Sequence, residues 1–322
     1  MSGGIFQQIS SVPWFSTASF GIVAMVLVGM SWCLTGLVMG RAPKRGIDTG
    51  LVQFFGGLVS ITVSLTTVLI SGASTPDSRR MLFLTLGMFY SSGALNFCTL
   101  QLMSAAMQRG PNGIIWSIIQ SGMVISFIVG VVFFGAALTL AKLCGIILLL
   151  AAIVCFGLAK DNSRRNGGGW RLLAFGAFTV CSIQQTVNTL PAYFPESRQV
   201  SSVLCTLATS SGAVTASIVF TLCTLSGEKV RRLWENVRNP HLWKYVLCLQ
   251  FFSLLFSWTL FYPGLFAMGK HGMGMVCFPL MVGSCILCFT LVGLFWLREK
   301  VRPLQIAALL MCLMGLACLA AI

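Results

Sequence analysis

The segment Met273–Leu297, MGMVCFPLMVGSCILCFTLVGLFWL, contains 25 consecutive residues without an Asp, Glu, Lys, Arg or His. A transmembrane α-helix needs about 20 predominantly apolar residues to cross the hydrocarbon core of a bilayer. In that core every backbone polar group must be paired within the protein, and a helix pairs them all inside one segment. The segment therefore predicts a membrane-spanning helix.

Nine further runs along the chain have the same character. The chain is 57% hydrophobic and only 9% charged, whereas a soluble domain carries about a quarter charged residues. Short polar connections with Pro, Gly and charged residues separate the runs. The sequence thus predicts an all-α integral membrane protein with ten transmembrane helices: Ser19–Gly40, Leu51–Ser71, Met81–Met107, Ile114–Gly135, Leu138–Ala159, Trp170–Leu190, Val200–Ser226, Tyr245–Met268, Met273–Leu297 and Leu304–Ile322.

The formal net charge of +14 follows from basic connections between spans. Sixteen of the 21 Lys and Arg residues fall on one side of the predicted bundle, and five fall on the other: Arg79, Arg80, Lys142, Arg198 and Lys270. The positive-inside rule then places the odd-numbered connections in the cytoplasm and both termini outside it. We expect a multi-pass protein of the inner (cytoplasmic) membrane, and no nucleic-acid-binding pattern is present.

Two segments have a local interpretation of their own. The first forty residues contain no Lys or Arg, so the first run lacks the basic region of a secretory signal and is expected to remain as helix one. The longest connection, Glu228–Lys244, contains an amphipathic piece at Val230–Trp234. This piece either lies on the anionic inner leaflet or is an ordinary solvated loop.

The thirteen Cys residues are scattered through apolar segments and are expected to pack as small hydrophobic side chains. Cys285 and Cys288 form a C-x-x-C inside one apolar run, without a second pair or a nearby His. A zinc or redox site needs such additional ligands. We therefore expect no metal and no cofactor.

The second half of the sequence repeats the first. Ala106–Met107 aligns with Ala267–Met268 at a shift of 161 residues, and Gly122 aligns with Gly283 in the same register. These matches pair predicted helices three to five with eight to ten. Because each half contains an odd number of spans, the two halves must have opposite orientations in the membrane. The predicted domains are two inverted five-helix repeats, residues 1–160 and 161–322.

The segment from Gly293 to Leu310, GLFWLREKVRPLQIAALL, followed by Gly315, resembles the end of an EamA-like domain of the drug/metabolite transporter superfamily. Such domains usually carry a Glu in the tight turn before a Gly-rich last helix, and Glu299 stands in that position. In the first half the corresponding stretch, 134–138, has Ala where the family usually has Glu. The resemblance implies a ten-helix transporter, and it names no substrate.

All seven acidic residues fall in connections or at the ends of spans. A proton antiporter that uses an embedded carboxylate is therefore disfavoured, which leaves Lys142 and His271 as the titratable candidates for ion coupling. The sequence also contains no HExxH, no GxSxG and no paired intramembrane acids, so we do not expect an enzyme. The coupling ion stays open.

Neutral polar and aromatic side chains within the spans are the candidate binding residues, because burying them in lipid is unfavourable unless they have a role. Gln184 and Asn188 are four residues apart and share one face of helix six, with Gln185 adjacent. By resemblance, the family lines its central cavity with helices one, three, four, six, eight and nine. The candidate substrate-binding residues are Trp32, Asn96, Trp116, Gln120, Gln184, Asn188, Gln250, Trp258 and Tyr262.

Amides with aromatic rings suit a neutral, hydroxyl-rich ligand, since amides bond hydroxyls and rings stack on the apolar face of a sugar. The leading expectation is a secondary transporter for a sugar or similar small polar metabolite, working by alternating access, as a monomer or homodimer. An amino-acid or drug/metabolite exporter of the same superfamily, and a channel or structural membrane subunit, are the alternatives. Two residues, Pro111 and Pro279, are candidate gating positions.

For several candidates a purely structural interpretation stands beside the functional one. Asn and Gln side chains can simply join helices through hydrogen bonds. Trp258 and Tyr262 can belong to an aromatic belt at the membrane surface. Proline and glycine are also widely tolerated in membrane helices without any gating role.

Overall fold

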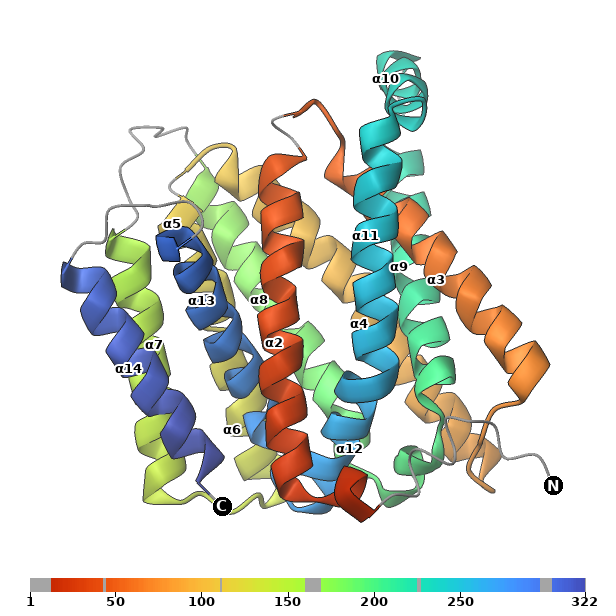
Figure 1. The fold of residues 1–322 in the computed structure, drawn as a ribbon. Helices are drawn as coiled ribbons and strands as arrows, with labels where there is room; N and C mark the ends of the chain where they lie inside the picture. The colour runs from red at the N-terminus through yellow and green to blue at the C-terminus, as the bar shows by residue number, and fades with distance from the viewer. Residues whose placement is uncertain are drawn as a thin grey trace.

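The computed structural model describes residues 13–42, 45–110, 112–159, 169–224, 227–295 and 303–321. These residues form helices and no strand (Figure 1). The elements are η1 Pro13–Ser16, α2 Ala18–Arg41, α3 Thr49–Ser71, α4 Arg79–Met107, α5 Asn112–Gln120, α6 Met123–Phe134, α7 Leu140–Ala159, α8 Trp170–Thr189, η3 Leu190–Tyr193, η4 Pro195–Gln199, α9 Ser202–Cys223, α10 Gly227–Val237, α11 Pro240–Phe256, η5 Ser257–Phe261, α12 Tyr262–Lys270, η6 Gly274–Val276, α13 Cys277–Phe295 and α14 Pro303–Ala320.

Eight helical segments within the described residues are long and apolar enough to cross a membrane. They are Ala18–Val38, Thr49–Ser71, Arg79–Met107, Ile114–Phe134, Ser202–Cys223, Pro240–Lys270, Gly274–Val292 and Pro303–Ala320. Helices α7 and α8 occupy the other two predicted runs, but the apolar part of α7 is shorter and α8 is not among the eight. The polar side chains of α8, among them Gln184, Gln185 and Asn188, lower its apolar content.

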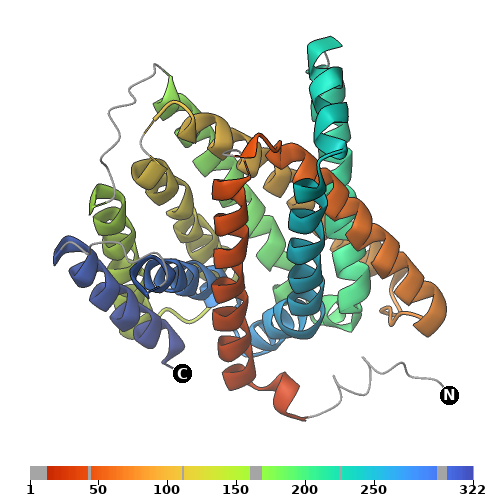
Figure 2. The ribbon, with the colours of Figure 1, turned by 45° about the horizontal axis from the view of Figure 1, so that its top comes forward.

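The helices form one bundle in which segments from both ends of the chain lie side by side. Helix α14 packs along α7 at one edge, and α3 packs against α9 near the opposite edge (Figures 1 and 2). Between them α2 packs on α12 and α13, while α8 packs on α4, α5 and α6. Several helices begin at a side-chain cap, as when Asp48 Oδ1 accepts the Gly50 N–H at 2.7 Å at the start of α3.

The main hydrophobic core gathers around α12, η6 and the first half of α13. Nearly every side chain from Phe261 to Ile286 is buried there, and the core includes Met268, Phe278 and Met281. Met25 of α2 and Phe127 of α6 pack into the same cluster. One end of the bundle is therefore tightly closed.

Helix four of the prediction is interrupted. Helix α5 ends at Gln120 and α6 begins at Met123, with a turn at Ser121–Gly122. A Cβ added at Gly122 would lie 2.8 Å from Ser182 Oγ and 3.1 Å from the Ile119 carbonyl oxygen. Glycine therefore permits α8 to approach closely at the break.

Helix eight is also interrupted, by a π-helical turn over Ser257–Phe261 between α11 and α12. Pro263 occupies the first turn of α12, directly after this segment. Proline and π-turns are the usual causes of a kink in a membrane helix, and π-turns occur frequently at functional sites. The sequence prediction treated this run as a continuous helix.

Pro279, a candidate gating position, does not interrupt the helix that contains it. Helix α13 begins at Cys277, so Pro279 is its third residue. The first four N–H groups of any helix have no partner within the helix, and proline at such a position loses nothing. The other gating candidate, Pro111, and the turn residue Glu299 lie outside the described residues.

Candidate functional site

Gln184 joins α8 to α4. Its Nε2 donates to Ser92 Oγ at 3.3 Å, and the Gln184 side chain is half-buried between the two helices. This contact matches the structural interpretation of membrane amides, in which a hydrogen bond between helices contributes about 0.6–2 kcal/mol. Gln184 therefore has a partner inside the protein.

Gln185 and Asn188 are different, because each keeps a carbonyl oxygen without a donor. Gln185 is 3% exposed and Asn188 is 8% exposed, yet Gln185 Oε1 and Asn188 Oδ1 have no hydrogen-bond partner. The Nε2 of Gln185 donates to Cys181 Sγ at 3.3 Å. Leaving such an acceptor buried and unpaired costs about 1–3 kcal/mol, so the pair points to a binding role.

The hydroxyl groups of Thr189 and Ser126, close to this pair at the end of α8, have partners within the protein. Thr189 Oγ1 lies 2.9 Å from Ser126 Oγ on α6 and 2.7 Å from the Gln185 carbonyl oxygen. Both hydroxyls are buried. They join the end of α8 to α6, and neither hydroxyl is a partner of the two amide oxygens.

The spacing of four residues predicts that Gln184 and Asn188 share one face of α8, with Gln185 only adjacent to it. Gln185 and Asn188 are three residues apart, and this spacing also places two side chains on one helix face. The sequence alone does not decide between the two glutamines. The position of α4 distinguishes them, because Ser92 of α4 accepts a hydrogen bond from Gln184.

Asn96 and Phe89 differ sharply in burial along one face of α4. The two residues are seven positions apart on α4 and therefore project from nearly the same face. Phe89 is fully buried with its ring centroid 5.0 Å from that of Tyr262, whereas Asn96 is exposed. The face that packs tightly near Phe89 is thus uncovered two turns later, toward the end of α4 that lies nearer to α10 (Figure 1).

Tyr262 lies inside the protein and not in an aromatic belt. It is 3% exposed, and its hydroxyl lies 2.9 Å from Thr209 Oγ1 on α9. A belt residue would have its ring at the lipid surface. Tyr262 instead connects α12 to α9 and closes over Phe89, while Trp258 in the π-turn is half-buried.

Three further candidates are half-buried. Trp32 on α2 has its ring centroid 6.2 Å from that of Phe278 on α13. Trp116 and Gln120 are one turn apart on α5, and Gln120 is the last residue before the break at Ser121–Gly122. Broken helices often form binding sites in transporters, because the unwound backbone provides free polar groups there.

Gln250 connects two helices. It accepts the Ser60 hydroxyl at 2.6 Å through Oε1, and its Nε2 contacts the position where a Cβ would stand on Gly56. Both partners belong to α3, which packs against α11. The structure thus separates Gln250 from the unpaired amides of α8 and gives it a helix-joining contact.

The closed end of the bundle is formed by η3 against α12 and α6. The Tyr193 ring stacks on Phe134 with centroids 4.1 Å apart, and a Cβ on Gly269 would collide with the Ala192 carbonyl oxygen. Arg198 donates through Nη2 to that carbonyl at 3.2 Å, and burial lowers the pKa of its guanidinium. This end is therefore held by close packing and by one basic group.

The candidate titratable groups lie at helix ends. Lys142 is the third residue of α7 and donates from Nζ to the Ala137 carbonyl oxygen at 3.2 Å. His271 follows α12, and its Nε2 lies 3.0 Å from the Ser16 carbonyl oxygen. No group of three or more His, Cys, Asp or Glu that could hold a metal ion occurs in the part of the chain that the structure describes.

Comparison with known proteins identifies the fold and no more. No protein-family model matches the chain, and no curated protein matches it. A solved structure described only as "Crystal structure of protein" is similar, with a TM-score of 0.64 and 11% identity over 94% of this chain and 95% of that chain. The chain is therefore an all-α, multi-pass membrane protein whose fold occurs in another protein of known structure.

Proposed function

We propose that the chain is a secondary transporter that moves a small polar metabolite by alternating access between two inverted five-helix halves, residues 1–160 and 161–322. The helix contacts support this arrangement. Helix α2 packs on α13, and its counterpart α8 packs on α5 and α6. Likewise α8 packs on α4, and α2 packs on α12. Exchanging the two halves converts each pair into the other.

Two contacts join equivalent helices of the two halves directly. Helix α7 packs on α14, and α3 packs on α9. In a two-fold arrangement such contacts lie on the symmetry axis. An odd number of spans per half then requires opposite orientations, which is the construction of many secondary transporters.

The observation that carries the proposal is the pair of buried, unpaired amide oxygens on α8. Gln185 Oε1 and Asn188 Oδ1 accept nothing from the protein, so a ligand with hydroxyl donors would satisfy both. The exposed Asn96 lies on α4 and the break follows Gln120 of α5, and both of these helices pack on α8. One closed end and one open end are the features expected of a carrier in one of its two states.

A sugar or a similar polyhydroxylated metabolite is the proposed substrate. Its hydroxyls are the donors that unpaired amide oxygens require, and rings such as Trp32 and Trp116 can stack on its apolar face. An amino acid or a cationic drug would need charged partners, and the described acids lie at helix ends or in connections: Asp48, Asp77, Glu196, Glu228 and Glu235. Such an exporter, and a channel or structural subunit, remain the competing functions.

The proposed setting is the cytoplasmic membrane, with both termini outside the cytoplasm. The distribution of Lys and Arg supports this orientation. The lipid bilayer is then the permanent partner, with a small-molecule substrate and, where transport is coupled, an ion. The EamA-like resemblance and the shared helical fold are consistent with this class of carrier.

A thermal-shift screen of the detergent-purified protein tests the proposal, because a ligand that binds the folded state raises its apparent stability. The panel contains sugars, amino acids, nucleosides and cationic dyes. We expect stabilisation by one class of sugar, and we expect Asn188→Leu to abolish it. Stabilisation by amino acids or dyes alone would favour the exporter, and no shift with any compound would contradict a metabolite site.

Gln250→Leu is the matched control. It removes an amide of the same size from another helix, and its partner is Ser60 on α3. This variant should lower the unfolding temperature without changing the shift that the sugar produces. Equal loss of the shift in Gln250→Leu and Asn188→Leu would show that general destabilisation, and not a binding contact, is being measured.

A further inference from the structure

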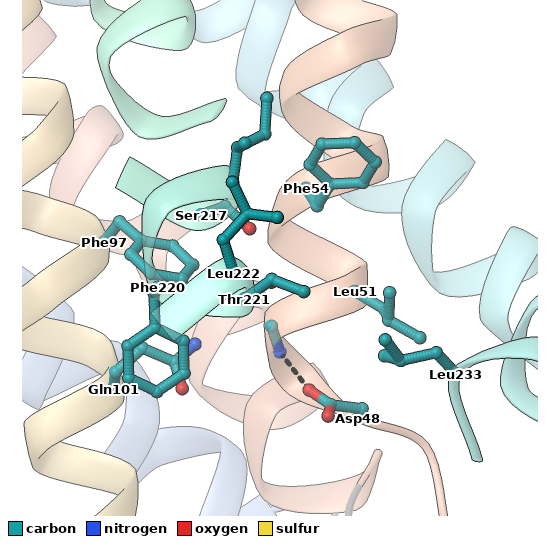
Figure 3. Close-up of a pocket in the computed structure, with 12 residues that line it drawn as sticks. Asp48, Leu51, Phe54, Phe97, Gln101, Ser217, Phe220, Thr221, Leu222 and Leu233 are labelled. Atoms are coloured by element: carbon teal, nitrogen blue, oxygen red, sulfur yellow. Dashed lines mark hydrogen bonds between the residues drawn. The ribbon is translucent and has the colours of Figure 1, made fainter. Parts of the chain in front are cut away.

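A cavity of about 250 Å³ lies between the ends of α3, α4 and α9, beside α10. Figure 3 shows Leu51 and Leu233 on one side of this pocket and Phe97 and Phe220 on the other. Its lining residues belong to helices other than α8, which carries the unpaired amides of the proposed metabolite site. The cavity is therefore a second place in the molecule where a small ligand can bind.

Asp48 gives the cavity its charge. It is the N-cap of α3 and is exposed, and its Oδ1 accepts the Gly50 N–H at 2.7 Å. No Lys or Arg occurs among the described residues that line the cavity. Arg45, three positions before Asp48, is directed to α11 instead, with Nη1 3.5 Å from His241 Nδ1 and its guanidinium 5.9 Å from the Tyr245 ring. The charge of the lining therefore favours a cation.

Gln101 adds an unpaired polar group at the same corner of the cavity. Its Nε2 is buried and has no acceptor, which is unfavourable unless a ligand provides one. A Cβ built on Gly50 would lie 3.2 Å from this nitrogen and 3.0 Å from Asp48 Oδ1. The amide and the carboxylate thus flank Gly50, and a ligand that satisfies both must carry a cation close to an acceptor oxygen.

The rest of the lining is mostly apolar and includes three aromatic rings, Phe54, Phe97 and Phe220. The rings of Phe97 and Phe220 pack edge to face with centroids 5.9 Å apart. Aromatic faces attract organic cations as well as apolar groups. A cavity of about 150 Å³ in another protein holds a benzene molecule. The larger volume of about 250 Å³ therefore suits one aromatic ring with a short polar side chain.

The position of the cavity at the end of the spans suits an amphiphile. The exposed Asp48 lies at the start of α3, where the chain enters the span. Ile218 and Leu222 of the lining are exposed on the membrane-spanning helix α9. Apolar side chains exposed on such a helix contact lipid, so a bound molecule meets water at its charged end and the bilayer at its apolar end.

We propose that this cavity binds an aryl amino alcohol, a molecule with an aromatic ring, a protonated amine and a hydroxyl group on neighbouring carbons. The ammonium group lies beside the Asp48 carboxylate, and the hydroxyl oxygen accepts the Gln101 N–H. The aromatic ring occupies the apolar space between Leu51 and Phe97. Amine and hydroxyl on adjacent carbons match the two polar groups that flank Gly50.

Isothermal titration calorimetry of the full-length protein in detergent tests the proposal with probes that share one phenyl ring. The probes are 2-amino-1-phenylethanol, 2-phenylethylamine, 1-phenyl-1,2-ethanediol and mandelate. We expect 2-amino-1-phenylethanol to bind tightest and 2-phenylethylamine to bind more weakly, with no measurable binding of the uncharged diol or the mandelate anion. Binding of the diol or mandelate as tight as that of the amines, or no binding of either amine, would overturn the proposal.

Asp48→Asn tests the role of the carboxylate, because Asn caps a helix as well as Asp does and leaves the start of α3 intact. It should weaken the binding of 2-amino-1-phenylethanol about fivefold, the upper range for an exposed ion pair. Asp77→Asn is the matched control, since Asp77 is exposed in a connection and does not line the cavity. Unchanged affinity in Asp48→Asn, or equal loss in both variants, would contradict the assignment.

Gln101→Leu tests the hydroxyl contact. This variant should bind 2-amino-1-phenylethanol and 2-phenylethylamine equally, which removes a preference of about fivefold. A preference equal to that of the wild type would overturn the role of Gln101. Asn188→Leu should bind both amines as the wild type does, whatever its effect on sugars, because Asn188 does not line this cavity. Loss of amine binding in Asn188→Leu would place the amine at the amides of α8 and overturn the proposal.

Discussion

Two adjacent glutamines on α8 have opposite surroundings. Gln184 donates to Ser92, whereas Gln185 buries a carbonyl oxygen without a donor. Replacing Gln184 by Leu removes a bond between helices and should lower the free energy of unfolding by about 0.6–2 kcal/mol. Replacing Gln185 by Leu removes an unpaired buried acceptor and should leave the ligand-free protein equally stable or raise its stability by about 1 kcal/mol.

Reversible unfolding in mixed detergent micelles, followed by circular dichroism, measures both changes. The comparison is internally controlled, because the substitution is identical and the positions are neighbours on one helix. A greater loss of stability for Gln185→Leu than for Gln184→Leu would show that Gln185 Oε1 has a partner in the folded protein, and the proposed binding contact would then be untenable.

The hydroxyl pair Tyr262 and Thr209 links α12 to α9 at 2.9 Å. A double-mutant cycle with Tyr262→Phe and Thr209→Val should give a coupling free energy of about 0.6–1.7 kcal/mol, as expected for hydrogen bonds inside membrane proteins. The control cycle pairs Tyr262→Phe with Thr215→Val, since Thr215 is exposed on the same helix. The control should give no coupling, and a value near zero in both cycles would argue against the bond.

At the scale of whole helices, glycine sets the distance between α4 and α9. A Cβ added at Gly93 would collide with the Thr209 carbonyl oxygen, and one at Gly212 would collide with that of Tyr90. Such small residues let two membrane helices approach closely. Gly93→Ala should therefore destabilise the protein by several kcal/mol or prevent folding, because backbone atoms cannot move aside as a side chain can.

Gly87→Ala on the same helix is the control. Gly87 is exposed, and a Cβ there meets nothing within 4 Å. Alanine favours a helix over glycine by about 1 kcal/mol, so this variant should be slightly more stable than the wild type. Thermal unfolding of the purified variants measures the difference, and similar stability for Gly93→Ala and Gly87→Ala would show that α4 and α9 do not pack as described.

The apolar pattern predicts the positions of the helices well and their interruptions poorly. Helix α8 begins at Trp170 as expected, because glycines precede it and an apolar run follows. The break after Gln120 has no proline, and its glycine is one of 33 in the chain. Only the approach of Ser182 shows why glycine is needed at position 122, and that contact joins residues about sixty positions apart.

Proline is the more visible signal in the sequence, but it does not show which of the two helices is interrupted. Pro279 lies in the first turn of α13, where it changes little, whereas Pro263 follows the π-turn that interrupts helix eight. Both residues stand inside long apolar runs in the sequence. Distinguishing them requires the starting residue of each helix, which is the least certain feature of any assignment from sequence.

For the molecule as a whole, polarity within spans singles out α8, where the structure places two unpaired amides, but it does not predict the individual contacts. The unpaired amides of α8 lie where the sequence placed its strongest polar face. Gln250, by contrast, bonds to Ser60 on α3, a pairing that depends on the arrangement of distant segments. Likewise Tyr262 is buried against Phe89. The residues next to Tyr262 and Phe89 in the sequence do not predict this contact.

The open end of the bundle can be tested by accessibility to solvent. On helix α4, Ser92 is 1% exposed, whereas Asn96 is exposed. Asn96 lies one turn closer than Ser92 to the end of α4 that is nearer to α10 (Figure 1). In a variant whose thirteen native cysteines are replaced, Asn96→Cys should react with a membrane-impermeant maleimide at least ten times faster than Ser92→Cys. The reason is that in the proposed carrier water should reach position 96 from the α10 side, whereas Phe89 and Tyr262 pack together beyond it.

The side from which the reagent enters tests the orientation at the same time. Inside-out vesicles should label Asn96→Cys and the α10 control Arg238→Cys, and intact cells should label Lys270→Cys alone. If Arg238→Cys reacts in vesicles while Asn96→Cys does not, then position 96 faces lipid and the open-end interpretation fails. If intact cells label Arg238→Cys instead, the bundle is inserted with its basic connections outside, and the two termini must lie in the cytoplasm.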